Sequence, residues 1–108
     1  MVYIMLTSWV RPDKGKAFGK IVLEAIKKFP ADESITKLIL QAVSADEEGI
    51  KAFSISEVVK GKISEAMKRS SNLALFYAEA IGEGFKYEVE TLMSAMEAMS
   101  VIGLEMPE

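Results

Sequence analysis

The sequence predicts an α+β fold in which two strand–helix–strand units share one antiparallel sheet. Along the 108 residues, apolar residues either alternate with a period of two, as in strands, or recur at helical spacing. These patterns follow one another in the order strand, helix, strand, strand, helix, strand. A polar segment with a glycine lies between the second and third alternating stretches, as a hairpin requires. The length suits one apolar core, so we expect residues 1–108 to form a single domain.

The first unit is predicted over residues 2–43. Both alternating sets of residues 2–10 are apolar, which is typical of a central strand covered on both faces. Pro12 suits a first helical turn, and apolar residues then recur at helical spacing from Phe18 to Phe29. Residues 35–43 alternate again and predict the second strand.

The second unit begins with the hairpin turn, predicted over residues 44–49. Its clustered acids, Asp46, Glu47 and Glu48, lack the spacing of a calcium loop, so we interpret them as turn residues. Residues 51–59 alternate as a third strand. The small side chains in that strand, such as Ser54, would let a helix sit close to the sheet.

Residues 61–81 carry a helix-spaced apolar stripe that two glycines terminate. Residues 85–91 alternate between apolar and charged side chains, which indicates an edge strand with one solvent-exposed face. A short amphipathic helix is expected over residues 92–102, where methionines 93, 96 and 99 would pack on the domain or its dimer mate.

This element order is the ferredoxin-like βαββαβ arrangement, a four-stranded antiparallel sheet with two helices on one face. We assign the more continuously apolar or small sets to the covered face: Val2, Ile4, Leu6, Leu38, Leu40, Ala42, Ala52, Ser54, Ser56, Val58, Phe85, Tyr87 and Val89. The other face, called the open face below, then carries Tyr3, Met5, Thr7, Trp9, Ile39, Val43, Phe53 and Ile55, with Lys37, Gln41, Glu57, Lys86, Glu88 and Glu90 around them.

The open face predicts self-association. Half of the residues are hydrophobic and the mean hydropathy is +0.19, high for so small a domain. If eight side chains each hide on the order of 50 Å², association gains about 10 kcal/mol before entropy is subtracted. We therefore expect a two-fold, face-to-face dimer that forms a closed or nearly closed barrel.

Composition excludes several functions. The net charge of −3 and the pI near 5.1 provide no basic field for nucleic acid or an anionic membrane. The chain has no cysteine and no histidine, so disulfides, thiolate catalysis and thiolate metal sites are excluded, and neither a metal nor a cofactor is predicted. A reducing, cytoplasmic location fits, and neither a secretion signal nor a membrane span is recognisable.

Two segments resemble a known superfamily. The start Tyr3–Trp9 with Pro12, and the later Phe53–Glu57, are similar to the dimeric α+β barrel superfamily, closest to small members of unknown function. The resemblance covers residues 1–91 and implies a dimer. It also implies that related enzymes, such as monooxygenases acting on polyketide quinones, place polar groups in a pocket between sheet and helices. Members that use histidine there find no counterpart in this chain.

Candidate site residues lie on the open face. Glu57 is the candidate catalytic acid or base, because an apolar surrounding raises the pKa of a carboxyl group; the alternative is a helix cap or a rim partner for a lysine. Tyr3, Thr7, Trp9 and Phe53 are candidate ligand-binding residues, or simply dimer core.

The preferred hypothesis is a cytoplasmic homodimer that binds a small apolar or aromatic ligand. The alternative is a cofactor-independent enzyme, monooxygenase-like or isomerase-like, that transfers protons through Glu57. An RNA-binding platform of Tyr3 and Phe53 is disfavoured because the basic, glycine-rich motif is missing.

Overall fold

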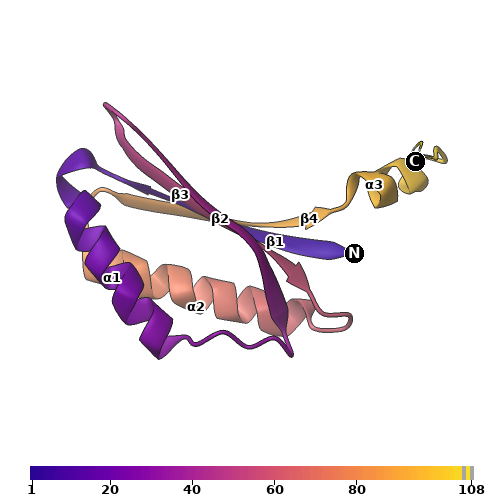
Figure 1. Cartoon of the computed structure of the whole chain (residues 1–108), viewed down its shortest axis with the longest axis horizontal. Coiled ribbons are helices and arrows are strands. Elements are labelled where there is room, and N and C mark those ends of the chain that lie inside the picture. Colours follow the sequence, from indigo (N-terminus) through magenta and orange to yellow (C-terminus); the bar gives the residue numbers. More distant parts are fainter. Residues whose placement is uncertain (106, 108) are drawn as a thin grey trace.

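The structure is a computed structural model that describes residues 1–105 and 107. Figure 1 shows four strands and their helices in the order β1 (Val2–Val10), η1 (Pro12–Lys14), α1 (Gly15–Lys28), β2 (Thr36–Asp46), β3 (Gly49–Val58), α2 (Ile63–Ile81), β4 (Phe85–Met93) and α3 (Ala95–Val101).

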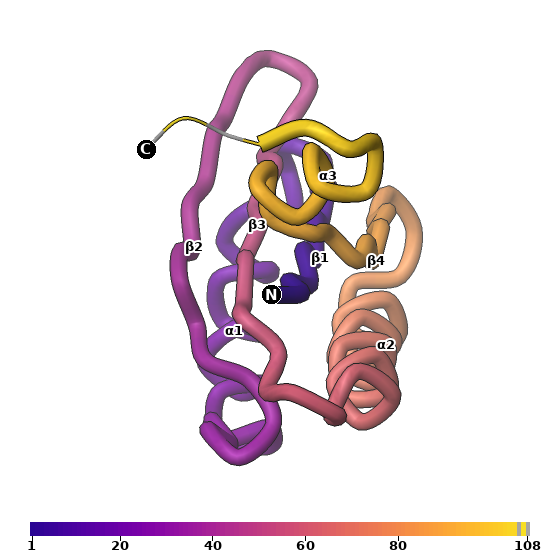
Figure 2. The backbone as a smooth tube through the Cα atoms, turned by 90° about the vertical axis from the view of Figure 1, so that its right-hand side faces the viewer, coloured from indigo at the N-terminus to yellow at the C-terminus, as the bar shows by residue number. Residues whose placement is uncertain are grey.

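All strand pairs are antiparallel, in the order β2-β3-β1-β4. Helices α1 and α2 lie side by side on one face of the sheet (Figures 1 and 2). The predicted ferredoxin-like fold is therefore confirmed, with the first strand in the centre and the charged fourth strand at an edge. No helix in the described part of the chain is both long and apolar enough to span a membrane.

The core lies between the central strands and the two helices. Ile4, Leu6 and Val10 of β1 are buried there, because alternate residues of a strand share one face. Phe18 of α1 meets Tyr77 of α2 edge to face, with 5.4 Å between the ring centroids. Burying such aromatic rings dominates the energetics of a small core and fixes how the two helices pack.

The hairpin turn forms as predicted between β2 and β3. The carboxylate of Asp46 accepts hydrogen bonds from the backbone N–H groups of Glu48 (2.8 Å) and Gly49 (3.2 Å). Gly49 has a φ of +140°, and a Cβ there would lie 2.1 Å from the carbonyl oxygen of Val10. Only glycine can occupy this position without moving the turn away from β1.

Strand β2 contains an irregularity that the sequence analysis did not predict. Leu38 pairs with Ser56, but Leu40 pairs with Ile55, so Ile39 is an extra residue in the ladder. After this β-bulge, the odd-numbered and even-numbered residues of β2 exchange faces of the sheet. The predicted sides were therefore wrong for four residues: Leu40 and Ala42 lie on the open face, and Gln41 and Val43 lie on the helix-covered face.

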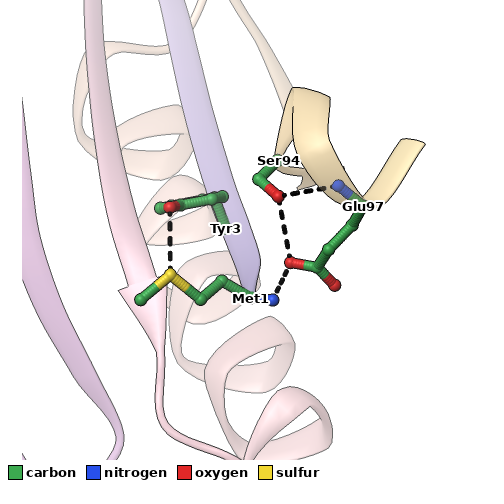
Figure 3. Close-up of polar contacts among 4 residues, drawn as sticks. All are labelled: Met1, Tyr3, Ser94 and Glu97. Carbon is green, nitrogen blue, oxygen red and sulfur yellow. Dashed lines mark hydrogen bonds and ion pairs between the residues drawn. The ribbon is translucent and has the colours of Figure 1, made fainter. Parts of the chain in front are cut away.

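Helix α3 lies beyond the ends of β1 and β4, away from α1 and α2 (Figures 1 and 2). The Ser94 hydroxyl accepts a hydrogen bond from the Glu97 N–H (3.1 Å) and donates one to the Glu97 carboxylate (3.2 Å), which also pairs with the Met1 amine (Figure 3). No residue of α3 is buried, and Met96 is 65% exposed. Of the two predicted alternatives, packing on its own domain is therefore not observed, and packing on a dimer mate stays a prediction.

Candidate functional site

A cavity of about 240 Å³ lies between the sheet and the two helices. Strands β1, β2 and β3 form its roof, and α1 and α2 form its walls. The lining residues are Leu6, Ser8, Phe18, Val22, Gln41, Ala42, Val43, Ala52, Phe53, Ser54, Leu73 and Tyr77. For comparison, an apolar cavity of about 150 Å³ is large enough to bind benzene.

Small side chains in the middle of the sheet create this cavity. Ala52 and Ser54 of β3 and Ser8 of β1 lie on the helix-covered face, where larger residues would fill the space. The sequence analysis expected such residues to bring a helix closer. Instead a space stays open between the sheet and the contacting rings of Phe18 and Tyr77.

A few polar groups converge on the largely apolar lining. Ser8 and Ser54 contribute hydroxyl groups, and the bulge in β2 turns the amide of Gln41 to the same face. Burial raises the pKa of the Tyr77 phenol above its ordinary value of 10.0, so that it stays protonated at neutral pH. Apolar walls with a few oriented polar groups are typical of small-molecule sites.

A second, smaller cavity of about 100 Å³ adjoins the first. The two share Leu6, Ser54 and Leu73 as lining residues, so they adjoin along the helix-covered face of the sheet. The second cavity adds a guanidinium and three hydroxyl groups, from Arg69, Thr36, Ser56 and Ser70. It lies at the C-terminal end of α1, because Phe29 forms part of its lining.

The predicted site residues lie on the opposite side of the sheet. Tyr3 pairs with Glu57, Thr7 pairs with Phe53, and Trp9 pairs with Lys51, all with side chains on the open face. Glu57 is half-buried, between Tyr3 on one neighbouring strand and Lys37 on the other. Thr7, only 2% exposed, is enclosed by larger side chains around it.

These residues do not gather at one point. Trp9 lies six positions along β1 from the residue paired with Glu57, about 20 Å away at the rise of an extended strand. Tyr3 and Phe53 are also four register positions apart, so they do not form a continuous stacking platform. The Lys51 ammonium lies 6.0 Å from the ring centroid of Trp9.

The sequence analysis missed the residues that line the two cavities. Of its candidates only Phe53 contributes to the larger cavity. The available signal was the run of small polar residues at Ser54 and Ser56, on a face predicted to pack against helices. In residues 1–105 and 107, no cluster of three or more acidic side chains is arranged to hold a metal ion.

No protein-family model and no curated protein sequence matches the chain. Solved structures do match. A candidate antibiotic biosynthesis monooxygenase from Caulobacter crescentus CB15 is 22% identical over 87% of this chain and 89% of that protein, with a TM-score of 0.52. A mutant of SnoaB, described as a cofactor-independent oxygenase from Streptomyces nogalater, is 9% identical over 87% of this chain and 93% of its own, with a TM-score of 0.53.

The de novo designed protein Foldit4 is similar to the same extent, at 17% identity over 86% of this chain and 97% of its own, with a TM-score of 0.53. These matches confirm the ferredoxin-like α+β fold and show the fold alone, because each of the three is less than 25% identical to this chain. Because a designed protein shares the fold with named oxygenases, the fold alone does not assign an activity.

Proposed function

We propose that this protein is a homodimer that binds a small, mainly apolar molecule in the space between its sheet and its helices. The single observation that carries the proposal is the cavity of about 240 Å³ beneath the central strands. Phe18, Val22 and Leu73 provide apolar walls, and Ser8 and Gln41 provide oriented polar groups. With the adjoining cavity, the space reaches the lower end of the range of small-molecule sites, roughly 300 Å³.

The surface of the single chain supports the dimer. The accessible area is 7562 Å². A compact monomer of this mass exposes roughly 6,000 Å², so about 1,600 Å² is in excess. The radius of gyration, 15.5 Å, also exceeds the value of about 13 Å for a compact chain of this length. A second copy that covers the open face and α3 would bury area of the size found in obligate dimers.

The residues of the open face suit such an interface. Met5, Phe53 and Ile55 lie at its centre, whereas Lys37 and Lys86 lie near its edges. An apolar centre with a charged rim is typical of interfaces between protein subunits. Absence of cysteine agrees with a reducing location, and we retain the cytoplasm as the proposed compartment.

Binding can be tested with small aromatic compounds and calorimetry. We expect compounds the size of indole to bind the protein, and Ser54→Phe to abolish binding because its ring occupies both cavities. Ser64→Phe, which places the same ring at an exposed position of α2, is the matched control. Binding that survives Ser54→Phe places the ligand elsewhere and contradicts the proposal.

The dimer can be tested by sedimentation equilibrium. We expect twice the mass of one chain at micromolar concentration. A well-folded monomer at 100 µM, on the order of the weakest specific interfaces, would contradict this part of the proposal.

A second candidate function is proton transfer by Glu57 in a cofactor-independent enzyme. Its half-buried position beside Tyr3 favours this candidate, because a dimer closed over the open face would shield the carboxylate from water. Substrate turnover on a panel of quinones and carbon acids should then be lost in Glu57→Gln and kept in Glu88→Gln. Equal rates in both variants would contradict it.

A further inference from the structure

We propose that the smaller cavity is a carboxylate site, in which Arg69 and the neighbouring hydroxyl groups bind the acid group of the ligand. The apolar body of the same ligand would then occupy the larger cavity. This inference rests on the ligand-binding function proposed above and specifies the chemical class: a small monocarboxylic acid with an aromatic or branched apolar body.

Arg69 is held in place by the end of α1. Its Nη2 donates hydrogen bonds to the carbonyl oxygens of Phe29 (3.3 Å) and Pro30. These bonds fix the plane of the guanidinium while the side chain stays half-buried. Within residues 1–105 and 107, Nη2 is the nitrogen of Arg69 that donates side-chain hydrogen bonds. The N–H groups of Nε and Nη1 are therefore left for a ligand. A rigid, oriented guanidinium is well suited to bind a carboxylate.

Three hydroxyl groups share the cavity with Arg69. They come from Thr36 at the start of β2, Ser56 of β3 and Ser70 of α2. In the described part of the chain no enclosed side-chain oxygen or nitrogen lacks a hydrogen-bond partner. Hydroxyl groups can donate to the free lone pairs of a carboxylate that Arg69 binds.

The local charge favours a monoanion. Asp32 lies in the field of Arg69, and its pKa is lowered chiefly by the hydrogen bond from the Ser34 hydroxyl, with Arg69 as a further cause. Asp32 is therefore ionised at neutral pH and offsets part of the guanidinium charge. The positive charge of Arg69, partly offset by Asp32, balances a single carboxylate better than a doubly charged phosphate.

The continuity of the two cavities sets the shape of the ligand. Leu6, Ser54 and Leu73 line both, so the two cavities adjoin there, and the proposed ligand would extend from Arg69 toward Phe18 along them, with one side open to solvent beside Val43, which is 68% exposed. The head of the ligand would meet hydroxyl groups and the guanidinium. The body would meet a largely apolar surface, which gains free energy in proportion to the area removed from water.

The experiment compares two matched series by calorimetry at pH 7: phenylalkanoic acids with one to four methylene groups, and the corresponding neutral amides. We expect the best acid to bind at least about tenfold more tightly than its amide, as a charge-assisted hydrogen bond implies. Arg69→Met should reduce the acid to the affinity of the amide and leave the amide unchanged. Lys68→Met, which removes an exposed charge from the neighbouring position of α2, should leave the preference intact.

The outcomes separate this inference from the proposed function. Equal binding of acids and amides, with both abolished by Ser54→Phe, would overturn the carboxylate site and leave the ligand-binding function standing. No binding of either series at millimolar concentration would overturn both. If Arg69→Met does not fold, Thr36→Val removes one hydroxyl at constant shape, and it should weaken the acid more than the amide; an equal effect on both overturns the inference.

Discussion

The two faces of the sheet differ in the size of the side chains that they carry at its middle. On the helix-covered face the middle strands carry small residues, such as Ser8, Ser54 and Ser56, above an open space. On the open face the same strands carry large ones, such as Met5 and Ile55. The large core residues Ile4, Leu6 and Val10 also lie on the helix-covered face, because burial of apolar area drives folding, so the contrast concerns the middle of the sheet.

This difference teaches that the two faces have separate roles. The covered face leaves room for a molecule other than the protein itself. The open face carries the apolar area that the proposed second copy would cover. Each of the following predictions changes one face and asks whether the other responds.

The largest expected effect comes from a charge on the open face. Ile55→Glu would bury an unpaired carboxylate from each chain in the proposed interface, and burying unpaired charge costs about 4 kcal/mol, roughly a thousandfold in the dimer dissociation constant. Sedimentation equilibrium measures this directly. Leu23→Glu, at a 63% exposed position of α1, is the control and should remain dimeric. A dimer that tolerates Ile55→Glu does not pair through this face.

Adjacent residues of β1 provide the second comparison. Ile4 is 3% exposed and packs with Val58 and Ala66, so Ile4→Ala should lower the free energy of unfolding by about 3 kcal/mol. The side chain of Met5 lies on the open face, so Met5→Ala should lower the free energy of unfolding by less than about 1 kcal/mol. Both are measured by urea unfolding of the otherwise unchanged chain at protein concentrations at which it is monomeric, where only contacts within the chain count. Similar losses for the two would mean that the chain buries both faces itself.

The smallest effect concerns Tyr77 in the wall of the larger cavity. Burial raises its pKa above 10.0 in the folded protein, so the unfolded chain loses this proton at lower pH than the folded one. Stability from this group is therefore complete below pH 10 and is lost as the pH rises through the folded pKa. Tyr77→Phe should unfold with a shallower loss of stability between pH 9 and 11. An identical pH profile would show that the phenol is hydrated in the folded state.

The strand order and helix positions were predictable because each depends on periodicity over many residues. Residues 2–10 are apolar on both alternating sets and residues 85–91 alternate between apolar and charged side chains, and both segments form strands in the predicted positions. Alternation cannot reveal a single inserted residue, so the exchange of faces after Ile39 was not predicted. For the same reason Gln41 was assigned to the wrong face of the sheet. The faces of β1, β3 and β4 were assigned correctly.

The cavity was not predictable, because small residues are compatible with either close packing or a void. The choice depends on where Phe18 and Tyr77 hold the helices, which is a tertiary property. Arg69 was missed for the same reason: nothing in the sequence shows that it reaches the end of α1. Glu57, Tyr3, Thr7 and Trp9 were placed on the correct face, and their roles stay predictions.

The extra residue at Ile39 also restricts how copies of the protein can aggregate. Strand β2 forms one border of the sheet, where unpaired N–H and C=O groups could add the strand of another molecule. The bulge interrupts the regular spacing of these groups midway along the strand, so an incoming strand could match only one half of it. The bulge therefore disfavours fibril growth along this edge of the sheet, and a dimer can still form.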